Sequence, residues 1–461
     1  MATALIIATA VLLLLPCAAR LGLRNPVTVT VAIWLAVGLL LAVRPFNLIE
    51  PGIRVSVAIV AGLTALCLPP LLLPGRWPAG SGDTSGRAGS PRLVVRPWPL
   101  AAAATLVLLA ALYGVLSYRS SVSAALGGVP FSQLDPKLIR WAELYGSVKL
   151  SSSGSIALGL APLLGCLAVL GGLGHRWWWF LLLPVSLGIV TQSPSRTAAL
   201  SVVVGSAFFY LLLTRVQHGP LVITGPRLRR GHLLALGGGI GALALGYFSY
   251  IGTALDKSQA APGLFPARWL PGPLLEPLLF QVGGVSAFTA ALEHPTGAGG
   301  PYDHFGRSMY TVVKVAKVLG APLPGPDPFA GYVDIPVPFN TYTAFGDIYF
   351  DLGLVGVVVL FLLMGVVVHL FTTWPEPGHP VSAWVLSTMA VVLTDSPVNM
   401  RFLDLDIVIQ AFVGALVLSL VLRRAPVPRA PDGAGEQPAP AAERPAEVLA
   451  GGPGGGSRVS R

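Results

Sequence analysis

The sequence carries little charge for its length. Of its 461 residues, 11% are charged and 54% are hydrophobic, whereas soluble domains carry about 25% charged residues. A chain this poor in charge could not cover a water-facing surface. Its apolar runs are continuous and do not alternate with polar residues, which favours helices over a closed barrel. The sequence therefore predicts an all-α, polytopic transmembrane helical bundle.

Cysteine and the common site motifs are also scarce. The three cysteines, Cys17, Cys67 and Cys166, fall inside or at the end of apolar runs, where they read as small packing residues and not as a disulfide or metal set. We find no Gly-rich phosphate loop, no metal-spaced His/Cys set and no nucleophile elbow. No cofactor or metal is therefore expected. The net charge of +10 is dispersed among loops, which argues against nucleic-acid binding.

The apolar runs predict about eleven spans, none with Asp, Glu, Lys or Arg near its middle. Ion-coupled transporters usually need such groups or broken helices at the membrane midplane. Their absence moves the expected chemistry to one membrane face. The predicted spans are 2–19, 27–43, 55–73, 98–118, 155–173, 177–192, 198–213, 233–255, 352–371, 381–393 and 407–422.

Arginine-rich segments set the expected orientation. Loops 75–97 and 214–231 are predicted to be cytoplasmic, because positive charge concentrates on that side of a membrane. The transmembrane domain is expected to cover 1–424, and the Pro/Gly/Ala/Glu-rich tail 425–461 to be disordered and cytoplasmic. Eleven spans then place the N-terminus and the long loop 254–351 outside.

The stretch from Ala254 to Gly353 is read as a loop with no apolar run long enough to span a membrane. It holds the largest supply of polar side chains. His304 and Arg307 would share one helix face if a helix starts near Phe305, so His304 could act as a base and Arg307 could hold a phosphate. The alternative is a solvated loop. Lys314 and Lys317, further along, read as the wet face of that helix.

A second polar group leads into the predicted span 352–371. Asp347 and Asp351 are four residues apart, so they lie on one helical face at the outer interface. Paired carboxylates could bind sugar hydroxyls or act as a base. The alternative is helix capping, where acidic residues are favoured. Asn340 and Tyr342 add to the density of polar groups.

Two further arginines are candidates. Arg196 lies in a turn of a few residues before the predicted span 198–213, where a guanidinium and a helix N-terminus would together suit a phosphate or pyrophosphate. Its alternative role is to anchor the helix to lipid headgroups. Arg401, between Asp395 and Asp404, would complete the outer group. Its alternative role is an ion pair with Asp404.

The run Asn340-x-Tyr342…Tyr349-Phe-Asp351-Leu-Gly353-Leu-Val-Gly356 resembles the bacterial O-antigen polymerase, or oligosaccharide repeat-unit polymerase, family. So does the short outer turn with Arg196 before a span. The resemblance covers roughly residues 190 to 405 in layout. It implies a multi-pass enzyme of the bacterial cytoplasmic membrane that joins polyprenyl-pyrophosphate-linked oligosaccharide repeat units on the outer face, without a nucleotide sugar.

The expected activity is therefore glycosyl transfer in cell-envelope polysaccharide or exopolysaccharide biosynthesis. Arg196 and Arg307 would stabilise the leaving pyrophosphate, and His304, Asp347 or Asp351 would take the acceptor proton. An O-antigen ligase-type transferase and a lipid-linked oligosaccharide flippase or transporter are the alternatives. Expected partners are the lipid-linked oligosaccharide, the bilayer, and a chain-length regulator or flippase. The remaining substrate-binding candidates are Arg401, Asn340 and Tyr342.

Overall fold

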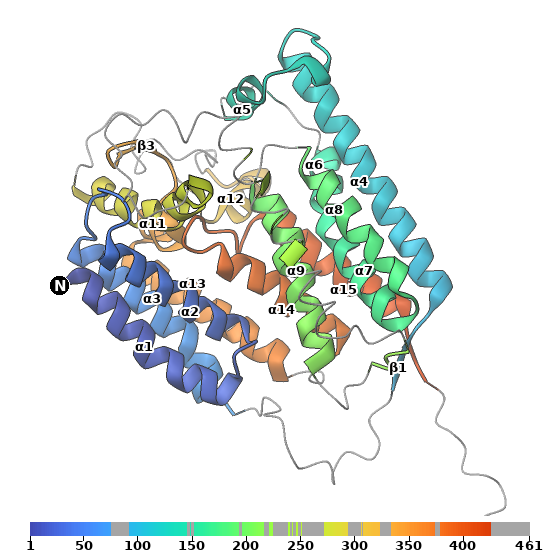
Figure 1. The fold of residues 1–461 in the computed structure, drawn as a ribbon, viewed down its shortest axis with the longest axis horizontal. Helices are drawn as coiled ribbons and strands as arrows, with labels where there is room; N and C mark the ends of the chain where they lie inside the picture. Colours follow the sequence, from blue (N-terminus) through green and yellow to red (C-terminus); the bar gives the residue numbers. More distant parts are fainter. Residues whose placement is uncertain are drawn as a thin grey trace, which may run out of the picture. The chain divides into compact units, whose positions relative to one another are not determined.

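Helices dominate the computed structural model of the chain (Figure 1). Residues Met1–Arg424 form one compact unit. Its helices are α1 (Ala2–Leu21), α2 (Pro26–Val43), α3 (Ile53–Leu72), α4 (Pro97–Ala125), α5 (Pro136–Leu144), α6 (Ser152–Gly159), α7 (Ala161–Gly174), α8 (Leu182–Val190), α9 (Arg196–Arg215), α11 (Gly272–Glu293), α12 (Tyr310–Val318), α13 (Thr343–Thr373), α14 (Pro380–Thr394) and α15 (Leu405–Val421). The structure describes residues 1–74, 92–144, 148, 152–192, 196–215, 221–224, 238–239, 242, 246–247, 250, 272–293, 306, 308–322, 333–373 and 379–425.

The predicted fold class is confirmed. Within the described residues, seven helices are long and apolar enough to cross a membrane by length and composition, and four shorter apolar helices accompany them. Ten of the eleven predicted spans coincide with helices, the sixth being shared between the short 3-10 helix Trp177–Leu181 and α8. The predicted span 233–255 lies largely outside the described residues. So do residues 426–461, the predicted tail.

The long segment 254–351 contains a helix that the sequence analysis missed. The prediction that this segment holds no apolar run long enough to span a membrane is wrong, because residues Leu274–Glu293 of α11 meet the length and hydropathy of a span. The contacts of α11 nevertheless lie at the ends of other helices. Ser286 Oγ donates to the carbonyl of Ile49 at 2.8 Å, and Thr289 Oγ1 accepts from the N–H of Gly52 at 3.2 Å.

Two groups of helices meet at α14. Helices α1, α2, α3 and α13 pack together on one side, and α4, α6, α7, α8, α9 and α15 on the other, while α14 contacts α2, α13, α9 and α15 (Figure 1). Helices α3 and α13 approach closely at Gly365 of α13, where a Cβ atom would collide with the carbonyl oxygen of Leu66 on α3. Cys17, Cys67 and Cys166 are buried within these groups.

The described parts of the predicted cytoplasmic loops meet at one end of the unit. Strand β1 (Leu93–Val95) pairs antiparallel with β4 (Leu422–Arg424), and Leu93 also bridges to Leu221. The turn between α14 and α15 lies at the other end, together with the start of α13. This arrangement agrees with the prediction that the Arg-rich loops lie on one side of the membrane and the polar segments around Asp347 and Arg401 on the other. Which of the two sides is cytoplasmic stays a prediction.

Helix α13 begins earlier than the predicted span 352–371. It starts at Thr343 and is interrupted at Gly353, whose φ of 67° and ψ of −168° are not helical. Glycine tolerates this positive φ because it has no Cβ. The residues from Thr343 to Asp351 therefore form a separate helical piece before the apolar part. It places Asp347 and Asp351 at the end of the unit where the turn between α14 and α15 lies.

Candidate functional site

The turn between α14 and α15, residues 395–404, is held by three hydrogen bonds to α2 and α13. The indole Nε1 of Trp34 on α2 donates to Ser396 Oγ at 2.9 Å, and the N–H of Ala344 on α13 donates to the Ser396 carbonyl at 2.8 Å. The N–H of Met400 donates to Asp347 Oδ2 at 3.0 Å. Because the partners of the turn belong to α2 and α13, the turn is fixed in place relative to both helices.

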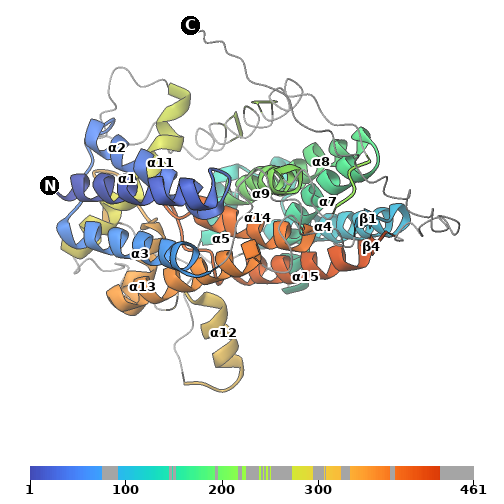
Figure 2. The same cartoon turned by 90° about the horizontal axis from the view of Figure 1, so that it is seen from below.

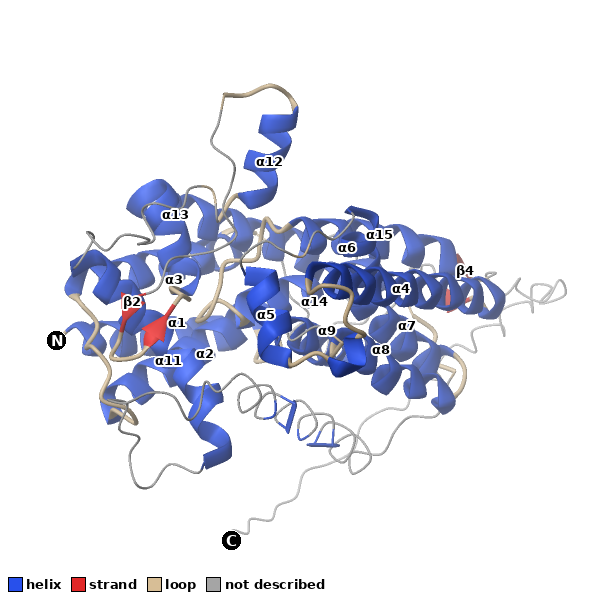
Figure 3. Cartoon of the chain, turned by 90° about the horizontal axis from the view of Figure 1, so that it is seen from above, coloured by secondary structure: helices blue, strands red, loops and turns tan. Residues whose placement is uncertain are grey.

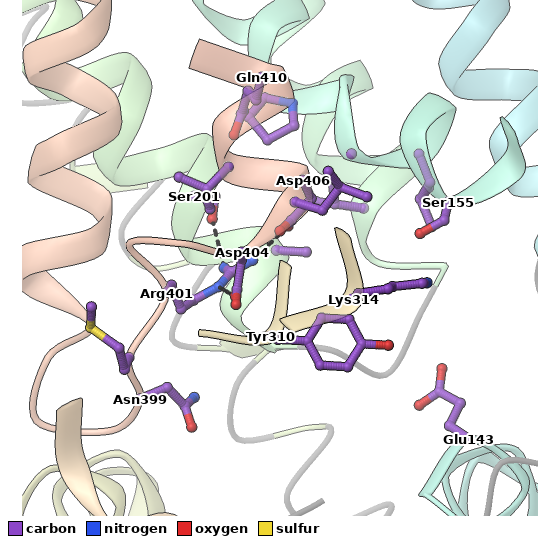
Figure 4. Close-up of a pocket in the computed structure, with 18 of the residues that line it drawn as sticks. Glu143, Ser155, Ser201, Tyr310, Lys314, Asn399, Arg401, Asp404, Asp406 and Gln410 are labelled. Atoms are coloured by element: carbon purple, nitrogen blue, oxygen red, sulfur yellow. Dashed lines mark hydrogen bonds and ion pairs between the residues drawn. The ribbon is translucent and has the colours of Figure 1, made fainter. Parts of the chain in front are cut away.

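This turn presents Arg401 to the carboxylates at the start of α15. Its Nη2 donates to Asp406 Oδ2 at 2.7 Å and its Nε to Asp404 Oδ2 at 3.2 Å, while its Nη1 lies 3.5 Å from Ser201 Oγ on α9. The Arg401 side chain is 13% exposed. Figure 4 shows the guanidinium lying between these partners. The ion pair with Asp404 is the role that the sequence left as an alternative for Arg401.

A cavity of about 620 Å³ opens beside Arg401. Its polar side chains come from segments that are far apart in the sequence, and Figure 4 shows Glu143, Tyr310 and Lys314 across the space from Asp406 and Gln410. The cavity therefore combines both helix groups with the α12 segment. Its lining residues include Tyr118, Glu143, Ser155, Ala198, Ser201, Tyr310, Lys314, Asp347, Asn399, Arg401, Asp404, Asp406 and Gln410.

Glu143 is held in place at the far wall. The Tyr118 hydroxyl donates to Glu143 Oε1 at 2.7 Å, and Arg140 Nη1 lies 2.9 Å from Glu143 Oε2. Tyr118 is buried near the end of α4, and α5 carries Arg140 and Glu143 together. Both carboxylate oxygens of Glu143 are therefore engaged, which fixes its orientation toward the cavity.

Two carboxylates near Arg401, those of Asp395 and Asp404, have raised pKa values. Burial raises the pKa of Asp395 to about 7, against the lowering effect of the Arg401 charge. Burial likewise raises the pKa of Asp404 to about 6, and the charge of Asp406 adds to this. For Arg401, burial alone would lower the pKa, but the charges of Asp406, Asp404 and Asp395 raise it above its ordinary value. Arg401 therefore stays charged, whereas Asp395 and Asp404 take up protons as the pH falls through about 7 and about 6 respectively.

Asp395 is the most enclosed member of this group. It is 3% exposed at the end of α14, and its Oδ2 has no hydrogen-bond partner among the described residues. A protonated carboxyl is favoured in such a place, because burial penalises the charged form. Asp395 therefore takes up a proton as the pH falls through about 7, whereas Asp404 has side-chain surface open to the cavity.

One wall of the cavity suits negative charge. Helix α9 begins at Arg196 with no acidic residue in its first turn, and Ala198 and Ser201 of this helix line the cavity. The N–H groups and dipole at a helix N-terminus favour anions. Lys314, which was predicted to be on the wet face of its helix, also lines the cavity. An anionic group and a proton acceptor could therefore lie side by side here.

The sequence-predicted site residues separate into distinct places. Asp347 and Arg401 line the cavity. Asp351 accepts hydrogen bonds from the backbone of Gly306 and Ser308 instead. Asp347 and Asp351 therefore share a helix but hold different segments.

The other predicted residues lie elsewhere. Tyr342 has no exposed surface, and its ring packs edge-on against Phe350. Asn340 is partly buried next to strand β3 (Pro338–Phe339). Neither is among the described residues that line the cavity. His304, Arg307 and the side chain of Arg196 lie outside the described part of the chain.

Several lining residues were not proposed from the sequence. Asp404 and Asp406 could have been found, because Asp395, Arg401, Asp404 and Asp406 form a dense charged group in a chain that has few charges. Glu143, Ser201 and Gln410 carry no comparable local signal, since only the tertiary fold brings them together. Comparisons with protein-family models, curated proteins and solved structures found no match.

Proposed function

We propose that this protein is a multi-pass membrane glycosyltransferase that polymerises lipid-linked oligosaccharide repeat units. The observation that carries the proposal is the cavity at one end of the helical unit, with Asp404, whose pKa is raised to about 6, on one wall and a helix N-terminus and Lys314 on another. Glycosyl transfer from a pyrophosphate donor needs these two functions together, namely a proton acceptor and stabilisation of a leaving anion.

In the proposed reaction, a hydroxyl of the incoming lipid-linked unit attacks the anomeric carbon of the growing chain. A new C–O bond forms as the bond from that carbon to the pyrophosphate oxygen breaks. The electron pair leaves with the polyprenyl pyrophosphate, and the hydroxyl proton passes to a carboxylate. Asp404 is the best placed described base, because it faces the cavity and its pKa is raised to about 6. Asp347 is the second candidate, and His304 stays a prediction.

The leaving pyrophosphate would lie against the positively charged wall of the cavity. Lys314 and the start of α9 supply positive electrostatic potential within the described cavity. Arg196 and Arg307 are the proposed additional cations. Their neighbours in the chain support this, since Ala198 and Tyr310 both line the cavity. Arg401 is already paired with two carboxylates, so its proposed role is to orient Asp404.

An ion-coupled transporter fits this arrangement less well. Such proteins concentrate titratable groups at the membrane midplane, whereas the clustered acids here lie at the ends of α14 and α15. A ligase-type transferase would use the same cavity for a single transfer. The proposed location is the bacterial cytoplasmic membrane, with the cavity on its outer face, where a flippase would deliver substrate and a chain-length regulator could bind.

The test is reconstitution of the purified protein in nanodiscs with a polyprenyl-pyrophosphate-linked repeat unit and no nucleotide sugar. We expect a ladder of lengthened lipid-linked products on a gel. Asp404→Asn should slow the ladder roughly 10²- to 10⁴-fold, as expected for loss of a general base. Glu50→Gln, at an exposed carboxyl distant from the cavity lining, is the matched control.

Other outcomes would identify the alternatives. Addition of one glycan to a different acceptor, without a ladder, would indicate a ligase-type transferase. Movement of the lipid-linked unit across a liposome membrane without any new covalent product would indicate a flippase. A ladder formed equally fast by Asp404→Asn would remove Asp404 from the mechanism and leave Asp347 and His304 as bases to test.

A further inference from the structure

Helix α12 exposes a stripe of apolar side chains. Val312, Val315, Val318 and Leu319 point outward, with exposed fractions between 48% and 82%. Val313 is the buried contact with the rest of the protein. A surface helix in water normally buries its apolar stripe and exposes its charged face. The exposed apolar stripe of α12 is therefore expected to lie in an apolar environment outside the protein.

The depth of α12 is set by α13. Asp351 holds Gly306 and Ser308, which lie four and two residues before the start of α12, through three hydrogen bonds of 2.9, 2.7 and 2.6 Å. Directly after Asp351, the exposed side chains of α13 become apolar, as at Leu352, Leu354 and Val355. The anchored start of α12 therefore lies at the level where the apolar exterior of α13 begins, which is the boundary between bilayer and water.

The other side of α12 faces the protein's own cavity. Tyr310 and Lys314 line it, and the Lys314 ammonium lies 5.7 Å from the centre of the Tyr310 ring. Lys317 is exposed on the same charged half of the helix. Figures 2 and 3 show α12 standing away from the transmembrane helices next to the start of α13, and its axis runs across α13 in Figure 2. The helix thus separates the cavity from an apolar exterior.

We propose that α12 is an interfacial helix that inserts Val312, Val315 and Leu319 into the bilayer leaflet on the cavity side. An amphipathic helix of this kind lies in the interface with its apolar face among the acyl chains. Lys314 and Lys317 then lie at headgroup level, where they attract anionic lipid. The rim of the cavity is consequently in contact with lipid, whichever reaction the cavity performs.

The test is site-directed spin labelling in nanodiscs. A nitroxide is attached to single cysteines at Val315→Cys and Leu319→Cys, and at Ser132→Cys as an exposed control in the loop after α4. The native cysteines are buried, and the unsubstituted protein measures their background labelling. We expect collisions with oxygen to exceed those with a water-soluble nickel chelate at 315 and 319, and the reverse at 132.

Two results would overturn the proposal. Nickel-chelate access at 315 and 319 equal to that at 132 would place the stripe in water. Low access to both oxygen and the chelate would show that protein covers it, either another part of the chain or a second copy. A helix control, Lys317→Cys, separates insertion from simple mobility, because it should show more chelate access than 315 when α12 lies at the interface.

Discussion

The carboxylate of Asp351 accepts hydrogen bonds from both the N–H and the hydroxyl of Ser308, at 2.7 and 2.6 Å. It also accepts one from the N–H of Gly306 at 2.9 Å. A carboxylate with this many donors is committed to holding a segment in place. Asp351 was predicted from sequence to be a base or a cap, and the structure gives it the geometry of an anchor for the segment that leads into α12.

Asp351→Asn should loosen this anchor. The amide replaces one acceptor oxygen by an NH₂ group that would face N–H donors, and each hydrogen bond to a charged group contributes about 1.5–3 kcal/mol. We expect hydrogen exchange of the α12 amides to rise roughly tenfold or more. Asp334→Asn, at an exposed carboxyl in the preceding hairpin, is the control. Unchanged exchange in α12 for Asp351→Asn would show that other contacts fix the helix.

Arg401→Gln should destabilise the protein. The substitution leaves Asp404 and Asp406 without their common cation. Because these two side chains are 31% and 40% exposed, we expect a cost of about 1–3 kcal/mol, between that of an exposed pair and that of a fully buried one. The matched control is Arg44→Gln, because Arg44 and Glu50 form an ion pair with both side chains 65% exposed, and such pairs contribute about 0–1 kcal/mol. Thermal unfolding in one detergent compares the two variants.

A second change separates charge from packing at this site. Adding Asp406→Asn to Arg401→Gln removes one of the uncompensated carboxylates, so the double variant should recover part of the lost Tm. A double variant less stable than Arg401→Gln would mean that Asp406 stabilises the fold through contacts other than Arg401.

Arg196→Ala should abolish polymer formation, and Arg196→Lys should retain part of it. Helix α9 begins at this residue, and Ser201, on the same helix, lines the cavity. Lysine keeps the charge but loses the planar set of donors. Loss of one charge-assisted hydrogen bond corresponds to a rate factor of roughly ten to a hundred or more. Polysaccharide length in a polymerase-null strain, at equal expression, is the measurement. Wild-type length with alanine would leave Arg196 a helix anchor.

Most of the transmembrane helices could be predicted from sequence because their apolar runs are long and uninterrupted. Helix α11 could not, since Glu276, Pro277 and Gly283-Gly284 dilute its hydropathy to 1.3, against 2.2–2.9 for the other six candidate spans. The helical spacing of Asp347 and Asp351 was recognised from the sequence, but the predicted span began only at 352, because the apolar run starts there.

The candidate site was predictable only where its residues are close in sequence. Arg401 and its acidic neighbours lie within a dozen residues, so their association could be foreseen. Glu143 and Lys314 reach the same cavity from α5 and α12, and no periodicity or spacing encodes that meeting. Tyr342 is a different case, because this residue of the motif is buried and its ring packs against Phe350, which only the fold reveals.

Gly284→Ala should disturb the turn that carries the site. A Cβ at Gly284 would lie 2.7 Å from the carbonyl oxygen of Pro397 and 3.1 Å from Thr343 Cγ2. Overpacking of this kind costs about 1–3 kcal/mol, which exceeds the gain of roughly 1 kcal/mol from replacing glycine in a helix. Gly188→Ala in α8 is the control, because nothing lies within 4 Å of its Cβ position. We expect Tm to fall for Gly284→Ala and to stay level or rise for Gly188→Ala.

Asp395 should give the protein a distinctive pH dependence. Its pKa is raised from 3.8 to about 7, chiefly by burial, so between these values the folded state holds a proton that the unfolded state releases. The corresponding stability is fully present below pH 3.8 and is lost as the pH rises through about 7. Asn mimics the protonated carboxyl and does not titrate. The stability of Asp395→Asn relative to that of the wild type should therefore increase as the pH rises.

The size of this stability difference depends on the pH range over which it is measured. Between pH 5 and pH 8 the wild type should lose about 2–3 kcal/mol relative to Asp395→Asn, at 1.36 kcal/mol per pKa unit. Thermal unfolding of both proteins across this range measures it, with Asp334→Asn as the exposed control. A gap between the Asp395→Asn and wild-type curves that stays constant with pH would mean that Asp395 is ionised in the folded protein. Arg401 would then compensate three carboxylates, and Asp395 would hold no proton for the cavity.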